Sequence, residues 1–226
     1  MSWESLPTPI VTTTRPWSRL REFFYFGLLQ ARSCVFAGAF FGVLLISQYV
    51  HWPGVPRPDF ILLAALLLQA ALLLGRVETA AEAGVLAVFH ALGLCLELFK
   101  TQPGINSWSY PELGHFHIGA VPLYSGFMYA AVASYMCQAW RVLHLRFTHY
   151  PPRWLAMPLA LGIYANFFTH HWLPDVRWFL AAAVLLIFWR TRVHFTVFRE
   201  RSMPLALGYA LVGFFVWVAE LSLIHI

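Results

Sequence analysis

Long apolar stretches separated by short polar segments dominate the chain. Seven of them predict membrane-spanning helices, at about 34–50, 60–75, 80–99, 120–140, 155–168, 176–189 and from about 205 onward. Apolar residues are continuous within each stretch and do not alternate, which is typical of transmembrane helices and not of barrel strands. The pattern predicts an all-α, polytopic helical transmembrane bundle. Several of its spans are shorter than the roughly 20 residues that a perpendicular crossing requires.

Composition supports this interpretation. Of 226 residues, 60% are hydrophobic and 11% are charged, whereas a soluble domain has about 25% charged residues. The sequence pI of about 9.4 is typical of nucleic-acid-binding proteins, but the arginines lie in the polar segments between apolar stretches. We therefore expect the lipid bilayer as partner and no nucleic acid. The sequence specifies no cofactor.

The positions of the basic residues predict an orientation. With a cytoplasmic N-terminus, 12 arginines lie in cytoplasmic segments and 3 basic residues lie outside, as the positive-inside rule requires. Residues 1–21 are expected to form a polar cytoplasmic leader and residues 22–220 a single helical membrane domain. The final string LSLIHI, residues 221–226, is similar to translated sequencing-adapter read-through. It is therefore expected to be a non-native tail that replaces the natural C-terminus.

The stretch 97–129 concentrates the residues that suggest chemistry. It is predicted to lie on the extracytoplasmic side between two spans. His90 and Glu97 are seven residues apart and share a helix face, and Lys100 follows closely enough to pair with Glu97. Ionisable residues inside a bilayer are costly and so indicate function. A structural ion pair at a helix end explains the pattern equally well.

A wider polar site is expected at the same membrane level. Its candidate catalytic residues are Glu97, Glu112, Lys100 and His90. The candidate substrate-binding residues are Trp108, Tyr110, Tyr129, Asn166, His170 and Glu220. A metal site is a less favoured alternative, which would use His115, His117, His170 and His171.

Two motifs have simpler structural interpretations. The run Trp108 to Glu112 is typical of an aromatic anchor around a turn at the membrane interface. Gly126, Ala130 and Ser134 recur every four residues, which predicts a helix-packing face of small residues.

Several longer motifs together resemble the bacterial membrane family known as domain of unknown function 817. They are ELFK at 97–100, SWSYPE at 107–112, VPLYSGFMY at 121–129, QAWR at 138–141, RFTHYPPRW at 146–154 and NFFTHH at 166–171. The resemblance implies a polytopic inner-membrane protein with about eight helices and a longer C-terminus. A more local likeness, over 97–123, is to carotenoid hydratases and lycopene cyclases, which protonate polyenes with carboxylates.

Three functions are compatible with these observations. The first is an intramembrane enzyme that applies carboxylate acid–base chemistry to an isoprenoid or lipid in an extracytoplasmic-side pocket. The second is a small proton- or ion-coupled transporter that uses Glu97, Lys100 and Glu220. The third is a structural or assembly subunit whose polar cluster binds a partner. The enzyme is the preferred hypothesis.

Overall fold

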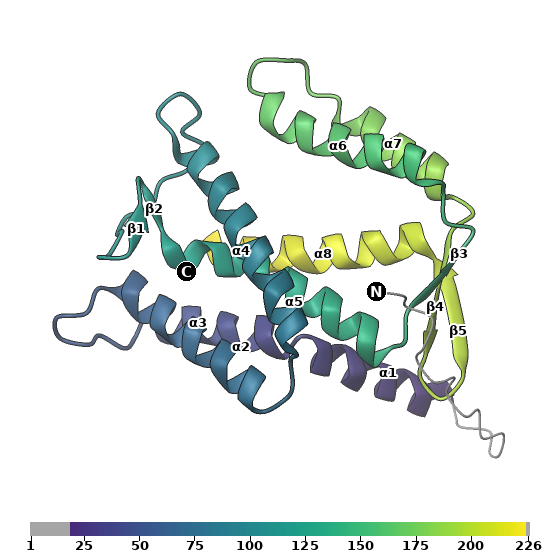
Figure 1. The fold of residues 1–226 in the computed structure, drawn as a ribbon, viewed down its shortest axis with the longest axis horizontal. Helices are drawn as coiled ribbons and strands as arrows, with labels where there is room; N and C mark the ends of the chain where they lie inside the picture. Colours follow the sequence, from purple (N-terminus) through teal and green to yellow (C-terminus); the bar gives the residue numbers. More distant parts are fainter. Residues whose placement is uncertain (1–18, 225–226) are drawn as a thin grey trace.

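A computed structural model describes residues 19–224, with the side chains of 219–224 left out of the description. Its helices are α1 Arg19–Ser33, α2 Val35–Ile46, α3 Arg57–Leu74, α4 Ala80–Thr101, α5 Gly126–Val142, α6 Arg153–Thr169, α7 Arg177–Phe188 and α8 Leu205–Ile224, with a short 3₁₀ turn, η1, at Leu123–Ser125 (Figure 1). The expected mostly helical fold is thus confirmed. The expected leader lies almost wholly outside the described residues, as does the end of the expected tail.

The prediction of seven spans is not supported. In the described part of the chain, α3 and α4 are long and apolar enough to cross a membrane, and α1 with α2, bent by 63°, are a third candidate. With 12 residues, α7 is about 18 Å long, short of the roughly 30 Å hydrocarbon core. The apolar run 120–140 is not one helix either, because it starts in a strand and in η1. These apolar helices suggest membrane association.

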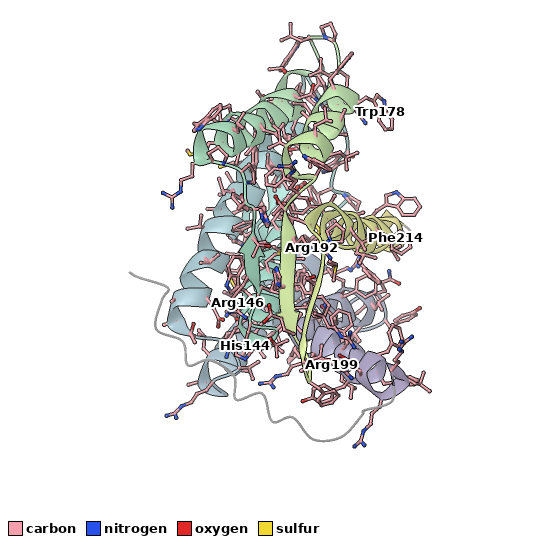
Figure 2. All side chains as sticks on the ribbon, turned by 90° about the vertical axis from the view of Figure 1, so that its right-hand side faces the viewer. His144, Arg146, Trp178, Arg192, Arg199 and Phe214 are labelled. Atoms are coloured by element: carbon pink, nitrogen blue, oxygen red, sulfur yellow. The ribbon has the colours of Figure 1, made fainter. Side chains whose placement is uncertain are left out.

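Short strands are a second departure from the all-α prediction. A hairpin pairs β1 His117–Ile118 with β2 Val121–Pro122, and a three-stranded antiparallel sheet joins β3 Arg146–Thr148, β4 Arg192–Thr196 and β5 Glu200–Pro204. Figure 2 shows that sheet, with Arg146, Arg192 and Arg199 labelled on or beside its strands. These segments are rich in arginine and were expected to be loops. Pairing satisfies their backbone groups, while Val193 in β4 is buried and its neighbours are not.

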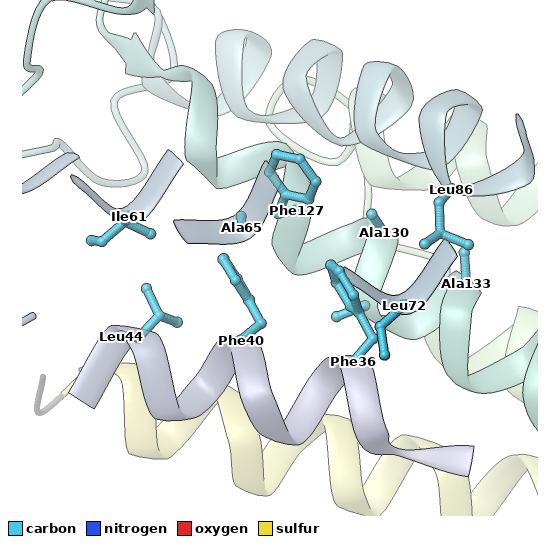
Figure 3. Close-up of a cluster of buried hydrophobic side chains, with 11 residues drawn as sticks. Phe36, Phe40, Leu44, Ile61, Ala65, Leu72, Leu86, Phe127, Ala130 and Ala133 are labelled. Carbon is cyan, nitrogen blue, oxygen red and sulfur yellow. The ribbon is translucent and has the colours of Figure 1, made fainter. Parts of the chain in front are cut away.

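The main core lies between α2, α3, α4 and α5. Phe36 stacks on Phe40 in its centre, Phe127 packs against both rings, and Ile61 and Ala65 from α3 close one side (Figure 3). The small residues Ala130 and Ser134 are almost fully buried on α5, which confirms the predicted packing face. A second, smaller core joins α6, α7, α8 and the sheet.

Sequence signals set the ends of the two long helices. Thr79 accepts a hydrogen bond from the Glu82 backbone, and the Glu82 side chain accepts one from the Thr79 backbone, so α4 begins with a capping box. Pro56 precedes α3, and Pro58 occupies its first turn, where the missing N–H costs nothing. The first turn of α3 and the last turns of α4 lie at the same end of the molecule, on the left in Figure 1. That end carries the candidate site.

Candidate functional site

Glu97 is the centre of a buried hydrogen-bond cluster at the end of α4. One carboxylate oxygen accepts from the Trp108 indole (2.9 Å) and the Tyr110 hydroxyl (2.7 Å), and the other accepts from the Tyr129 hydroxyl (2.8 Å). Glu97 is only 3% exposed. Burial raises the pKa of Tyr110, and the charge of Glu97 raises it further, so this phenol stays protonated and donates. The structure thus brings together Glu97, Trp108, Tyr110 and Tyr129, four of the residues that the sequence analysis named as site candidates.

Two glycines allow α4 and α5 to approach closely enough for this cluster. A Cβ on Gly93 of α4 would lie 2.6 Å from Cγ of Tyr129, and a Cβ on Gly126 of α5 would lie 2.6 Å from the carbonyl oxygen of His90. Tyr129 of α5 therefore packs directly on Gly93 of α4, and His90 of α4 packs directly on Gly126 of α5. The close approach places the Tyr129 hydroxyl on Glu97.

Lys100 is directed away from Glu97. Its ammonium contacts Nε2 of His171 at 3.0 Å and lies 4.3 Å from the centre of the Phe167 ring. Lys100 is 6% exposed, and the ion pair with Glu97 that helical spacing allowed does not form in the described structure. Lys100 instead ties α4 to the turn between α6 and α7.

The remaining predicted residues lie elsewhere. Asn166 bonds to Asp175 and to the Val176 backbone within the α6–α7 turn, so it does not reach the Glu97 cluster. His170 packs against His171 with ring centres 4.1 Å apart and the ring planes tilted by 36°. Glu112 is exposed. The side chain of Glu220 lies outside the described residues.

A second buried carboxylate, missed by the sequence argument, lies at the same end of the molecule. Asp59, in the first turn of α3, accepts from the backbone N–H groups of His115 and Phe116 and contacts Nδ1 of His115 at 2.7 Å. Asp59 is 7% exposed, while the His115 side chain is 72% exposed. The imidazole is therefore held at one nitrogen by a carboxylate, and its other nitrogen faces outward without a partner in the described structure.

Gly114 makes this arrangement possible. Its φ is +72°, and a Cβ there would lie 2.9 Å from the Asp59 carboxyl carbon. Only glycine adopts such a conformation without strain and allows the following backbone N–H groups to reach the carboxylate.

An apolar groove of about 640 Å³ runs from this pair along α3 and α4. Its walls are Asp59, Leu62, Leu63, Leu66 and Gln69 from α3, Ala83, Leu86, Ala87 and His90 from α4, and Phe116, Leu123 and Phe127. From Asp59 to Gln69 the groove is about 15 Å long at 1.5 Å per residue. Leu63 and Leu66 on its walls are more than half exposed, so it opens sideways from the helix pair.

Two polar atoms in the groove walls lack partners. Oε1 of Gln69 and Nδ1 of His90 are buried without a hydrogen bond in the described structure. The Nδ1 atom of His90 lies against Gly126, which leaves Nε2 as the ring nitrogen available to a molecule in the groove. The predicted functional residue His90 thus lines the groove and lies apart from the Glu97 cluster.

Comparison with known proteins assigns the family. Residues 22–223 match the model described as "Protein of unknown function (DUF817)". The chain belongs to the DUF817 family. It is 47% identical over 202 residues to the "Uncharacterized protein YoaT" of Bacillus subtilis (strain 168), covering 89% of this chain and 76% of the relative. No solved structure matches. These comparisons add no support for the likeness to carotenoid hydratases and lycopene cyclases.

The metal alternative is not favoured by the geometry of this DUF817 chain. Among the side chains that the structure describes, those of residues 19–218, no three His, Cys, Asp or Glu groups lie close enough together to hold an ion. His115 is engaged with Asp59, and Nδ1 of His117 contacts the Gly119 carbonyl. His170 and His171 belong to the Lys100 contact instead.

One signal could have identified Asp59 in the DUF817 sequence. It is the only acidic residue in the polar segment 51–59, which separates the first two apolar stretches. It directly follows Pro58, at the start of the second predicted span. Its partner is 56 residues away. Sequence spacing within one helix could not indicate that pairing.

We expect Gly114→Ala to disrupt the Asp59–His115 pair, because the methyl group would overlap the carboxylate and φ would be strained. The expected loss of unfolding free energy is about 2–4 kcal/mol, from overpacking and weakened bonds to a buried charge. Urea titration of the purified protein in detergent measures it. Gly104→Ala is the matched control, since a Cβ there meets nothing within 4 Å. Equal stability of the two variants would contradict the prediction.

Proposed function

We propose that the protein is a membrane enzyme that performs acid–base chemistry on an amphiphilic lipid or isoprenoid. The observation that carries the proposal is the Asp59–His115 pair at the mouth of the apolar groove. The pair supplies a group that can move a proton, and the groove supplies a place for the apolar chain. Neither the Glu97 cluster nor the Lys100 contact offers both.

His115 is the proposed proton-transfer group. Asp59 accepts the hydrogen on Nδ1, which fixes the tautomer and leaves the lone pair of Nε2 directed outward. Such an imidazole can take a proton from a substrate or a water molecule, and the buried carboxylate then stabilises the imidazolium that forms. The exposed position of His115 lets it meet a polar head at the membrane surface.

The groove defines the substrate class. Its volume of about 640 Å³ falls in the range of roughly 300–1,000 Å³ typical of ligand pockets. Eleven of its twelve wall residues lie on α3 and α4 or are aromatic, and Asp59, Gln69 and His90 are its few polar walls. A single acyl or prenyl chain that enters sideways from the bilayer fits this shape, with its head beside Asp59 and His115.

In this proposal Glu97 and Glu112 are no longer the catalytic residues that the sequence analysis expected. The three hydrogen bonds to Glu97 occupy its carboxylate, and it does not line the groove. Glu97 therefore positions Trp108 and Tyr110, and with them the segment that leads to His115. The exposed Glu112 lies in the same segment and is left as a surface group.

Topology completes the proposal. The basic segments 141–153 and 190–201 lie together around the β3–β4–β5 sheet, away from His115. The positive-inside rule places such a basic region in the cytoplasm. We propose that the N-terminus is cytoplasmic in a bacterial inner membrane and that His115 acts on the extracytoplasmic side.

His115→Gln tests the enzyme proposal. General acid–base groups contribute about 10²–10⁴-fold to rates, so this variant should abolish any lipid or isoprenoid species that the wild-type protein produces. Cells that express the wild type, His115→Gln or no protein are compared by lipid mass spectrometry at matched protein levels. His117→Gln is the control, because it removes an exposed histidine two residues away that does not contact Asp59.

Two results would count against this proposal. The first is a lipid and isoprenoid profile that is the same with and without the wild-type protein. The second is a product that persists undiminished in His115→Gln. A substrate gradient across vesicles that depends on the protein, without chemical change, would favour the transporter hypothesis instead.

A further inference from the structure

Lys100 is a buried cation without an acidic partner in the described structure. It is 6% exposed and lies in the last turn of α4. Lysine is almost never buried unless it is paired with an anion. The C-terminus of α4 supplies about half a unit of negative charge. The remaining positive charge is uncompensated.

The neighbours of Lys100 add no anion. His171 offers Nε2 at 3.0 Å, and Phe167 offers only its ring face. Desolvation lowers the pKa of His171, and Lys100 and His170 lower it further, so this imidazole is neutral beside the ammonium. With Nε2 accepting from Lys100, the hydrogen of His171 resides on Nδ1 and is available to another acceptor.

The acidic residue of the α6–α7 turn, Asp175, is already engaged. Asp175 accepts hydrogen bonds from Asn166 and from the Arg177 backbone, and it pairs with the Arg177 side chain. These contacts lower the pKa of Asp175 to about 2. Arg177 is close enough to repel Lys100. The region around the α6–α7 turn thus holds excess positive charge.

We propose that Lys100 and His171 bind a phosphate group. The ammonium has three hydrogens and uses one, and the Nδ1–H of His171 adds a second kind of donor, so a group with several acceptor oxygens satisfies both. The site is separate from the Asp59–His115 pair and does not depend on its chemistry.

The surroundings suit a phosphate at a membrane surface. Phe99 packs on Phe168 and Trp172 beside Lys100, and Trp172 is 65% exposed. Exposed tryptophan of this kind is typical of the headgroup level of a bilayer. The phosphate is carried by a lipid headgroup or is free in solution, and both share the same oxygens.

Thermal unfolding tests the site in two arms. In detergent, inorganic phosphate is added to the full chain at constant ionic strength, with chloride as the reference anion. In nanodiscs, phosphatidylcholine alone is compared with phosphatidylcholine that contains phosphatidic acid. A ligand that binds the folded state raises the Tm. A rise in the first arm indicates free phosphate, and a rise in the second alone indicates a lipid.

Lys100→Met should have two opposite effects. Without phosphate its Tm should exceed that of the wild type, because it removes an unpaired buried charge. With phosphate or phosphatidic acid its Tm should no longer rise, which corresponds to an affinity at least about tenfold weaker for the loss of one charged hydrogen bond. His171→Gln, at an exposed position, should weaken the response without preventing folding. Arg153→Gln, at the far end of α6, should respond as the wild type does.

The proposal is overturned if neither arm raises the Tm of the wild type. It is also overturned if chloride produces the same rise, or if Lys100→Met and His171→Gln both respond as the wild type does. None of these results bears on the lipid profile of His115→Gln, so the two proposals fail independently.

Discussion

Gly93→Ala is expected to destabilise the protein by about 3 kcal/mol. The added methyl group would lie 2.6 Å from Cγ of Tyr129. Overpacking of this kind costs about 1–3 kcal/mol, and displacement of Tyr129 also removes a hydrogen bond to a charged group worth about 1.5–3 kcal/mol. The helix propensity of alanine offsets about 1 kcal/mol.

Gly84→Ala on the same helix provides a control of opposite sign. A Cβ at Gly84 meets nothing within 4 Å, so this change should add up to about 1 kcal/mol of stability. Unfolding in denaturant, followed by tryptophan fluorescence in detergent, measures both. A cycle with Tyr129→Phe separates the lost hydrogen bond from the steric clash. A Gly93→Ala variant as stable as Gly84→Ala would show that α4 and α5 can separate at no cost.

Glu97→Gln is expected to cost about 2–3 kcal/mol and to loosen the segment that follows α4. An amide places a donor where a carboxylate oxygen accepts from Tyr129, or from Trp108 and Tyr110, so at least one buried donor loses its acceptor. Hydrogen–deuterium exchange should accelerate over residues 102–113, and the Tm should fall. If Glu97 were only a proton donor to a substrate, Glu97→Gln would leave both the exchange rate over residues 102–113 and the Tm unaltered.

Glu112→Gln is the matched control for that experiment. Glu112 is an exposed glutamate in the same segment, and surface substitutions are usually within about 0.5 kcal/mol. A Glu97→Gln variant with the exchange pattern of Glu112→Gln would remove the positioning role that we assign to Glu97.

The sequence grouped Glu97 with Trp108, Tyr110 and Tyr129 because all four belong to one stretch, 97–129, but it did not predict the hydrogen bonds among them. A carboxylate near the end of an apolar helix needs donors, and the next segment carries tryptophan and tyrosine. The small residues of α5 likewise indicated close packing, which the structure confirms. Hydrophobic continuity also predicted the long helices α3 and α4, and their ends follow from proline and a capping box.

The other features depend on contacts between distant residues. Lys100 could reach Glu97 by helical spacing, but His171 lies 71 residues away and only the fold brings it close. Asp59 and His115 meet for the same reason. Seven spans were expected because every apolar stretch was taken as a membrane-crossing helix. One of these stretches includes residues 120–125, where β2 and η1 form a compact turn, and others form helices too short to cross a membrane. An apolar segment is either buried inside the protein or in contact with lipid, and hydrophobicity alone does not distinguish these two environments.

The Glu97 cluster has a consequence for how the protein enters a membrane. During synthesis α4 leaves the ribosome with Glu97 and Lys100 still unpaired, and each such charge opposes partitioning into lipid by about 2.5–3.5 kcal/mol at the centre of a span. The hydroxyl that completes the Glu97 cluster arrives only with Tyr129, on α5. We therefore expect α4 to be retained at the insertion machinery until α5 has been made and Tyr129 can donate its hydrogen bond to Glu97.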